Sequence, residues 1–222
     1  MNRRHLLLIG CLQAAATSTA LAQSDPKPAA LVDAAARGDL AQVRALPERG
    51  ADVEQRDANG RTAIVAATAG NHLAVVRALI ARGADVNAQD HRQDSAFLLA
   101  GARGHTEIVR ATLAAGADLR STNRYGGTAL IPACHYGHVD TVRLLLTTAI
   151  DVDHVNRLGW TALLEAVILG EGGAAHQEIV RMLIARKADV NLADRQGVTP
   201  LAHARQRNQD AVVRLLLAAG AH

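Results

Sequence analysis

The sequence is poor in aromatic residues. One Phe, one Trp and two Tyr make up 2% of the 222 residues, while 49% of all residues are hydrophobic and 20% are charged. A chain with this apolar content is not disordered. Because large rings are scarce, Ala, Leu, Ile and Val must fill the core, which favours thin helices packed closely together.

Cysteine is also scarce, with two residues in the chain. Cys11 lies in the segment MNRRHLLLIGCLQAAATSTALA, residues 1–22, whose basic start, apolar middle and Ala-Leu-Ala end are typical of a secretory signal peptide. Cleavage would leave Cys134 alone, so no internal disulfide is expected. Two alternatives remain. Leu-Ile-Gly-Cys ending at Cys11 fits a lipobox, and Arg3-Arg4 fits a twin-arginine export signal.

No excess of charge remains once the predicted signal is removed. Without Arg3 and Arg4, 22 basic residues face 21 acidic residues, which gives no electrostatic argument for binding nucleic acid. Apart from the N-terminus, no run is long and apolar enough to suggest a membrane span. We therefore expect no membrane insertion of the cleaved chain.

The rest of the sequence repeats with a period of 33 residues. Hydroxyl residues precede short apolar runs, as helix caps do, and a second run in each unit carries apolar residues at helical spacing. The pattern predicts turn, helix, turn, helix in every unit, with left-handed glycines ending the second helix at Gly50, Gly83, Gly116 and Gly220. After a short leader at 23–29, the predicted units are 30–56, 57–89, 90–122, 123–155, 156–193 and 194–222.

These units resemble ankyrin repeats. The stretch NGRTAIVAATAGNHLAVVRALIARGADVN in the second unit matches the pattern G-x-T-P-L-H-x-A-A-x-x-G-H-x-x-V-V-x-x-L-L-x-x-G-A-D-V-N at almost every landmark. The resemblance implies an all-α solenoid of helix-turn-helix units with β-hairpin fingers, and a concave face that grips another protein. With the export signal and the glycine-rich fifth unit, the chain also resembles small exported ankyrin-repeat proteins of Gram-negative bacteria.

Five departures from the pattern predict local differences. Pro47 is expected to break the last turn of the second helix in the first unit. Gln93, Ala149 and Lys187 stand where glycine is expected, and a non-glycine residue held left-handed costs about 1 kcal/mol. The fifth unit has five extra residues, 171–175, which we expect to cover the apolar Ile168 and Leu169.

The resemblance places a set of side chains on the finger tips and inner helices of the concave face. Interface hot spots are enriched in Trp, Tyr and Arg, and three of the four aromatic residues fall here. The alternative is that they are structural filler. The candidate protein-binding residues are Arg92, Arg124, Tyr125, His135, Tyr136, Arg157, Trp160, Glu165 and Arg195.

Enzymatic chemistry is not expected. Cys134 and His135 are neighbours, which point about 100° apart on a helix and cannot share a proton. Glu165 could pair with His135 or His203, but no nucleophile or oxyanion donor converges with them. The histidines at the helix turns match the family pattern and are expected to be structural. No metal-ligand spacing or phosphate-loop pattern is present, so no cofactor is expected.

These features predict a monomeric, non-enzymatic interaction module in the periplasm. It would bind an exported protein through repeats 3 to 5, and the finger arginines favour an acidic partner surface. The alternative is an immunity or antitoxin-like factor, or a lipid-anchored envelope scaffold held through Cys11.

Overall fold

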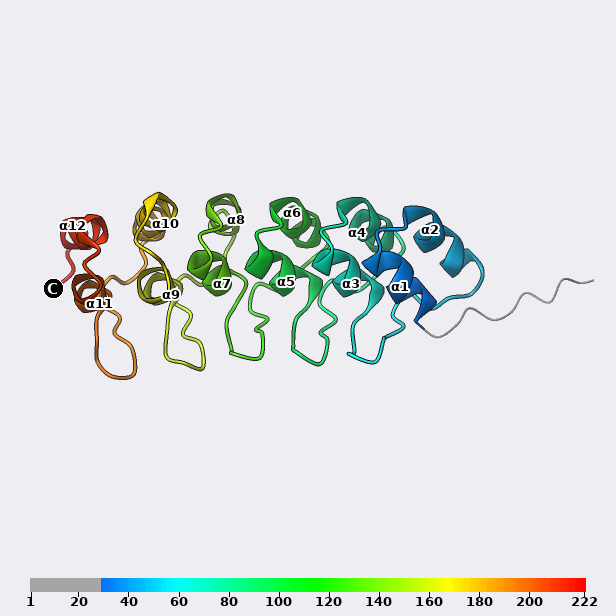
Figure 1. Cartoon of the computed structure of the whole chain (residues 1–222), viewed down its shortest axis with the longest axis horizontal. Coiled ribbons are helices and arrows are strands. Elements are labelled where there is room, and N and C mark those ends of the chain that lie inside the picture. The colour runs from blue at the N-terminus through cyan, green and yellow to red at the C-terminus, as the bar shows by residue number, and fades with distance from the viewer. Residues whose placement is uncertain (1–28) are drawn as a thin grey trace, which may run out of the picture.

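The computed structural model describes residues 29–222, so the predicted signal peptide, its lipobox and twin-arginine alternatives, and most of the leader lie outside the described residues. The described residues form an elongated stack of helix pairs, with inner helices in one row and outer helices in the other (Figure 1). The inner helices are α1 Ala30–Ala36, α3 Ala63–Ala69, α5 Ala96–Arg103, α7 Leu130–His135, α9 Ala162–Ile168 and α11 Pro200–Gln206. The outer helices are α2 Leu40–Glu48, α4 Leu73–Ile80, α6 Thr106–Ala114, α8 Val139–Leu145, α10 Ala174–Ala185 and α12 Asp210–Ala218.

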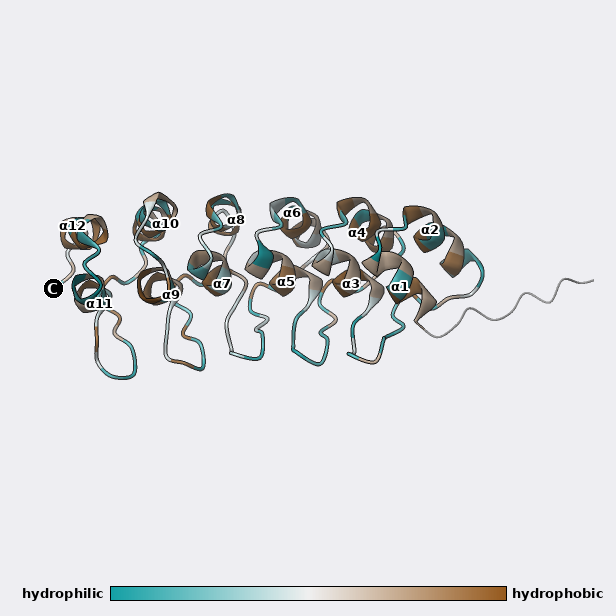
Figure 2. Cartoon of the chain, in the orientation of Figure 1, coloured by the Kyte–Doolittle hydropathy of each residue, from teal (hydrophilic) through white to brown (hydrophobic). Residues whose placement is uncertain are grey.

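The core runs the length of the stack between the two rows. Small inner-helix residues such as Ala66 and Ala67 pack with Val76 and Leu79 of the outer row, and all four are buried. Phe97 is completely buried in this core. The brown, hydrophobic residues are accordingly concentrated in the helices, while the loops below them are mostly teal or white (Figure 2).

Neighbouring inner helices approach closely because their contact residues are small. A Cβ atom added at Gly101 on α5 would lie 2.8 Å from the Cβ of Ala129, which precedes α7. Protein interiors tolerate no such overlap without a shift of the backbone. The alanine and glycine content of the sequence thus sets the spacing of the repeats.

The hydroxyl residues before the inner-helix runs of the second to sixth units are Thr62, Ser95, Thr128, Thr161 and Thr199. Three of the five cap their helices as predicted. The side chains of Ser95, Thr161 and Thr199 accept hydrogen bonds of 3.2 to 3.3 Å from backbone N–H groups in the first turns of α5, α9 and α11. Thr62 and Thr128 do not cap, and their buried hydroxyls have no partner among residues 29–222. At Thr128 the helix starts later, with Ala129 as the N-cap.

Glycine ends the outer helices as predicted. Gly50, Gly83, Gly116 and Gly220 have φ between 83° and 89°. Lys187 and Gln93 also adopt left-handed backbone, with φ of 64° and 60°, as their positions predict.

The prediction for Ala149 is wrong, because its φ is not positive. Helix α8 already ends at Leu145, and the side chains of two threonines make the hydrogen bonds at its C-terminus. The hydroxyl of Thr147 donates to the carbonyl of Leu144, and that of Thr148 donates to Leu145 and accepts from the Ile150 N–H.

The prediction for Pro47 is also wrong, because α2 continues through it to Glu48. Proline lacks one N–H, but in the last turn that loss does not stop the helix. The N–H groups of Arg49 and Ala51 bond to the carbonyl of Leu46, and Gly50 bonds to that of Pro47.

The insertion in the fifth repeat partly becomes helix. At 12 residues α10 is longer than the other outer helices described here. Ile168 is buried as expected, but Leu169 is 40% exposed, so the prediction that the insertion covers both residues is wrong for Leu169. The turn is held from the last repeat, since the Gln209 amide donates to the carbonyls of Val167 and Gly170.

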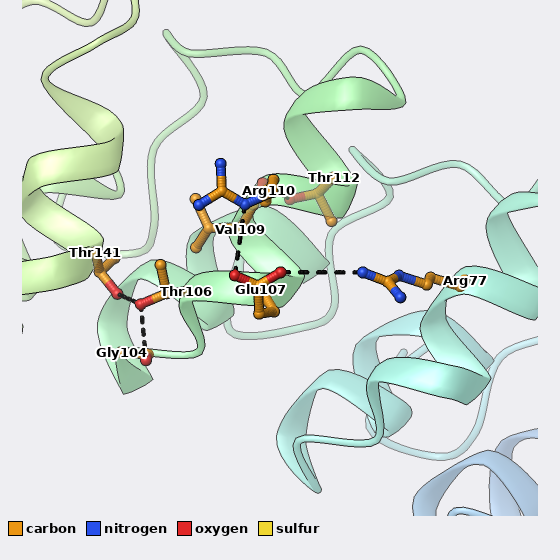
Figure 3. Close-up of polar contacts among 8 residues, drawn as sticks. All are labelled: Arg77, Gly104, Thr106, Glu107, Val109, Arg110, Thr112 and Thr141. Atoms are coloured by element: carbon orange, nitrogen blue, oxygen red, sulfur yellow. Dashed lines mark hydrogen bonds and ion pairs between the residues drawn. The ribbon is translucent and has the colours of Figure 1, made fainter.

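The outer surface carries exposed ion pairs. Glu107 lies 3.9 Å from Arg77 of the preceding repeat and 3.4 Å from Arg110 on its own helix (Figure 3). The Thr106 and Thr141 hydroxyls are 2.7 Å apart and join α6 to α8 (Figure 3). Exposed pairs contribute at most about 1 kcal/mol each.

Over residues 29–222, no helix has the length and apolar character to cross a bilayer.

Candidate functional site

Five fingers hang from the inner row as hairpin-shaped loops (Figure 1). They contain no regular strand within residues 29–222, so the predicted β-hairpin fingers are turns. Each finger starts with a side chain whose oxygen accepts two backbone N–H groups at 2.8 to 3.1 Å. These residues are Asp57, Asp90, Asn123, Asn156 and Asp194.

A concavity of about 360 Å³ lies between the fingers and inner helices of repeats 4 and 5. The fingers contribute Arg124, Tyr125 and Leu158, and the inner-helix side contributes Pro132, Tyr136 and Leu169. Tyr125 is 51% exposed and Tyr136 is 60% exposed. Two of the four aromatic residues of the chain therefore present their rings to solvent at one hollow.

Glu165 on α9 also lines this hollow, but it is only 6% exposed. The prediction that it occupies an exposed inner-helix position is wrong. Its side chain turns to the finger, where Oε1 accepts a hydrogen bond of 3.0 Å from Nδ2 of Asn156. Burial raises the pKa of Glu165 to about 7, against the hydrogen bond from Asn156, which lowers it.

His135 on α7 faces the other oxygen of this carboxylate. Its Nδ1 lies 3.6 Å from Oε2 of Glu165, and its ring stacks on Tyr136 with centroids 4.1 Å apart. Burial, and then the nearby His176, lower the pKa of His135. The imidazole is therefore mainly neutral at pH 7, and this contact is not a charged pair.

Arg124 and Tyr125 form the finger side of the hollow as one unit. The Arg124 guanidinium lies 4.5 Å from the centroid of the Tyr125 ring and donates a hydrogen bond of 3.1 Å to its hydroxyl. Cation–π contacts of this kind contribute about 0.5 to 1 kcal/mol at exposed sites. The contact places the Tyr125 ring and the Arg124 charge together at the finger side of the hollow.

Arg157 and Arg195 join neighbouring fingers. The Arg157 stem lies over Gly126, where a Cβ would come within 2.8 Å of it, and its Nη1 donates to the carbonyl of Arg124 at 2.8 Å. The Arg195 stem covers Gly159 in the same way. Both residues are exposed, so they can contact a partner as well as stabilise the fingers.

Arg157 and Arg195 do not line the hollow, and two more predicted residues, Arg92 and Trp160, also lie outside it. Arg92 lines a neighbouring concavity of about 260 Å³ with Asn59 and Asp94. Trp160 is partly exposed and does not line the hollow between repeats 4 and 5. The structure thus brings together Arg124, Tyr125, His135, Tyr136 and Glu165.

Sequence reasoning missed Leu158 and Leu169, which are 48% and 40% exposed at this hollow. Leu158 stands at a finger tip, where an apolar residue is itself a signal of contact. Leu169 stands after the last residue of α9, and its exposure follows from the path of the inserted turn.

Cys134 and three of the turn histidines have structural roles. Cys134 is buried, which raises the pKa of its thiol, with a further contribution from Glu165, and makes it a poor nucleophile. The turn histidines His72, His138 and His176 donate to carbonyls of the preceding repeat at 2.9 to 3.2 Å, as predicted. Among residues 29–222, no three His, Cys, Asp or Glu side chains are grouped to hold a metal ion.

Known proteins with similar sequences and structures share this architecture. The family model for ankyrin repeats matches residues 6–90, 96–194 and 151–222. The chain is 44% identical over 57 residues to the putative ankyrin repeat protein YahD of Escherichia coli K12, which is 26% of this chain and 28% of YahD. It thus spans less than a third of that relative.

Two solved structures extend the comparison over most of the chain. An ankyrin repeat domain from Acinetobacter baumannii has a TM-score of 0.84 and 50% identity, covering 87% of this chain and 99% of that domain. The ankyrin repeat domain of human ASB11 has a TM-score of 0.75 and 26% identity, covering 87% and 84%. Ankyrin repeat proteins are non-enzymatic binding scaffolds that generally bind other proteins. The chain belongs to the ankyrin repeat family.

Proposed function

We propose that this protein is a periplasmic interaction module that binds one exported protein through the concave face of repeats 3 to 5. The observation that carries the proposal is the hollow between repeats 4 and 5, where Tyr125 and Tyr136 are both more than half exposed. A soluble surface rarely gathers exposed aromatic and apolar side chains without a partner.

The charge around the hollow supports a partner with acidic groups at the rim. Arg124, Arg157 and Arg195 are exposed along successive fingers. Rim charges act mainly on the rate of association and on the choice of partner. The periplasmic location is inferred from the residue pattern of 1–22.

The test is crosslinking in intact cells followed by purification of the protein from the periplasmic fraction. Tyr125→Ala combined with Tyr136→Ala should lose the captured partner, because truncating a hot-spot residue typically removes about 2 kcal/mol of binding energy. Leu217→Ala is the matched control, since Leu217 is an exposed apolar residue on the outer helix α12. A partner retained equally by the double variant contradicts the proposed face, and recovery of the protein only in the cytoplasm contradicts the location.

A further inference from the structure

Glu165 is an acid at a position where the fold needs only a hydrogen-bond acceptor. In the last repeat, the equivalent contact joins Nε2 of His203 on the helix to Oδ2 of Asp194 on the finger at 2.7 Å. In the fifth repeat the acid is on the helix, and the finger offers it one amide hydrogen from Asn156. A neutral glutamine at position 165 would accept that hydrogen bond equally well. The hydrogen bond between the finger and the helix therefore does not explain why position 165 is an acid.

The carboxylate also lacks a positive partner within the described part of the chain. Its Oε1 is occupied by Asn156, and the basic group paired with Oε2 there is His135, 3.6 Å away and mainly neutral. The Arg124 guanidinium at the rim pairs with the Tyr125 hydroxyl instead. A buried carboxylate without a cation is costly, and a cation brought by a ligand offsets that cost.

The walls of the hollow favour a guanidinium over an ammonium group. Tyr125, Tyr136 and Pro132 are flat or apolar surfaces. A guanidinium is planar, stacks on aromatic rings and is more weakly hydrated than an ammonium, which keeps its water. A volume of about 360 Å³ lies at the small end of the range for ligand sites and suits one long side chain.

We propose that the hollow between repeats 4 and 5 receives an arginine side chain of the bound protein. The guanidinium pairs with Glu165, and the aliphatic stem lies against Tyr125 and Tyr136. The inference rests on the proposed function and adds the chemistry of the residue that enters the hollow. The partner then presents one arginine surrounded by acidic residues. Its arginine pairs with Glu165 inside the hollow and its acidic residues face the finger arginines, which together fix the position of the partner on this face.

The direct test uses N-acetyl-arginine methylamide as the probe. We would titrate it into the isotopically labelled full chain at a pH of about 8, above the pKa of Glu165, and follow the NMR signals of the Asn156 side-chain amide and the Tyr136 backbone. The arginine probe should shift both signals saturably. The neutral isostere N-acetyl-citrulline methylamide should bind about tenfold more weakly, as expected when one ion pair of about 1.4 kcal/mol is lost.

Glu165→Gln is the decisive variant, because it keeps an acceptor for Asn156 and removes the charge. It should lose most of the preference for the arginine probe over the citrulline probe, while Asp94 still lines the hollow. Glu107→Gln, which removes an exposed carboxylate on the outer helix α6, should bind as the parent does. Equal binding of the two probes to the parent, no binding at all, unchanged arginine preference in Glu165→Gln, or stronger binding of N-acetyl-lysine methylamide would each overturn the inference.

The cellular crosslinking experiment separates this inference from the proposed function. If Tyr125→Ala with Tyr136→Ala loses the partner while Glu165→Gln retains it, the face binds a protein but no arginine enters the hollow. If neither variant loses the partner, the proposed face itself is wrong. Thermal unfolding of Glu165→Gln checks that the repeat still folds, and we expect it to be at least as stable as the parent near pH 8.

Discussion

Asn156 and Glu165 are joined by a hydrogen bond of 3.0 Å from a finger to the inner helix nine residues later. Asp194 and His203, at the same spacing in the last repeat, are joined at 2.7 Å with acid and donor exchanged. For Asp194, burial alone would raise the pKa, but hydrogen bonds from Val198, His203 and Gln196 outweigh it and lower the pKa. The same contact between finger and inner helix therefore holds Asp194 ionised at pH 7, whereas Glu165 is about half ionised at that pH.

The first prediction concerns the pH dependence of stability. Glu165 titrates near 4.5 when unfolded and near 7 when folded, so the folded state holds the extra proton between these values. Stability is therefore lost as the pH rises through this window. Relative to the parent, Glu165→Gln should gain up to about 3 kcal/mol in unfolding free energy between pH 4.5 and 7.5.

Urea denaturation of both proteins across this range checks the prediction. His105 and His135 have lowered pKa values, because these histidines lose protons more readily in the folded state. Their contribution to stability therefore rises with pH, opposite to that of Glu165. Both proteins contain them, so the difference between the two curves reports on Glu165 and on its contact with His135. A difference that stays constant with pH would contradict the raised pKa.

The second prediction places a second acid beside Glu165. Asn156→Asp keeps the oxygen that accepts the Leu158 and Trp160 N–H groups but replaces the amide donor with a like charge. We expect a loss of about 2 kcal/mol at a pH near 8, because a buried hydrogen bond is removed and two carboxylates repel. The loss should be smaller near pH 5, where Glu165 is protonated and can donate.

Asn123→Asp is the matched control for this change. Asn123 makes the same two backbone contacts in the preceding finger, and the residue nine positions later is Pro132. Chemical denaturation should find its stability nearly unchanged at both pH values. An equal loss in the two variants would show that the aspartate harms the finger itself and not the contact with Glu165.

The repeats were predictable because their signals are local. The helix pairs and the glycine ends each follow from the residue pattern within one unit, and the structure confirms both. Ala149 shows the limit of that reasoning. It replaces a glycine just as Lys187 does, but the hydroxyls of Thr147 and Thr148 close the helix in another way.

The site was only partly predictable, because it depends on how fingers curl against helices. Tyr125 and Tyr136 follow from the family positions, and the structure places both at the hollow. The burial of Glu165 depends on Asn156 reaching it from the finger, and no local pattern reports that contact. Trp160 misses the hollow although its sequence position is close to Leu158, which lines it.

The third prediction concerns Lys187, whose φ is 64°. Glycine adopts this backbone without the steric cost that a Cβ imposes, and this relief outweighs the greater freedom that glycine gives the unfolded chain, so Lys187→Gly should stabilise the protein by about 0.5 kcal/mol. Ala149→Gly is the comparison, because Ala149 is not left-handed. That change should destabilise by about 0.5 to 1 kcal/mol through the greater freedom of the unfolded chain. Thermal unfolding should therefore rank the two variants on opposite sides of the parent.

The last prediction concerns His105, the turn histidine whose Nε2 is buried without a hydrogen-bond partner among residues 29–222. His72 and His138 donate from Nε2 to the carbonyl 36 residues earlier, and for His105 that carbonyl belongs to Ala69. Nη1 of Arg103 occupies it instead, at 2.7 Å. Burial, then the charge of Arg103, then His138 lower the pKa of His105.

Arg103→Met should therefore raise the pKa of His105, because it removes a nearby positive charge and leaves the Ala69 carbonyl for the imidazole. An NMR titration of the histidine ring signals measures this change directly, and Arg77→Met on the outer helix α4 serves as an exposed arginine control. Since a lowered histidine pKa makes the fold lose stability as the pH falls below about 6.5, the variant should also lose less stability between pH 7 and 5. An unchanged pKa would mean that Arg103 does not affect the titration of His105 and does not keep the imidazole from the Ala69 carbonyl.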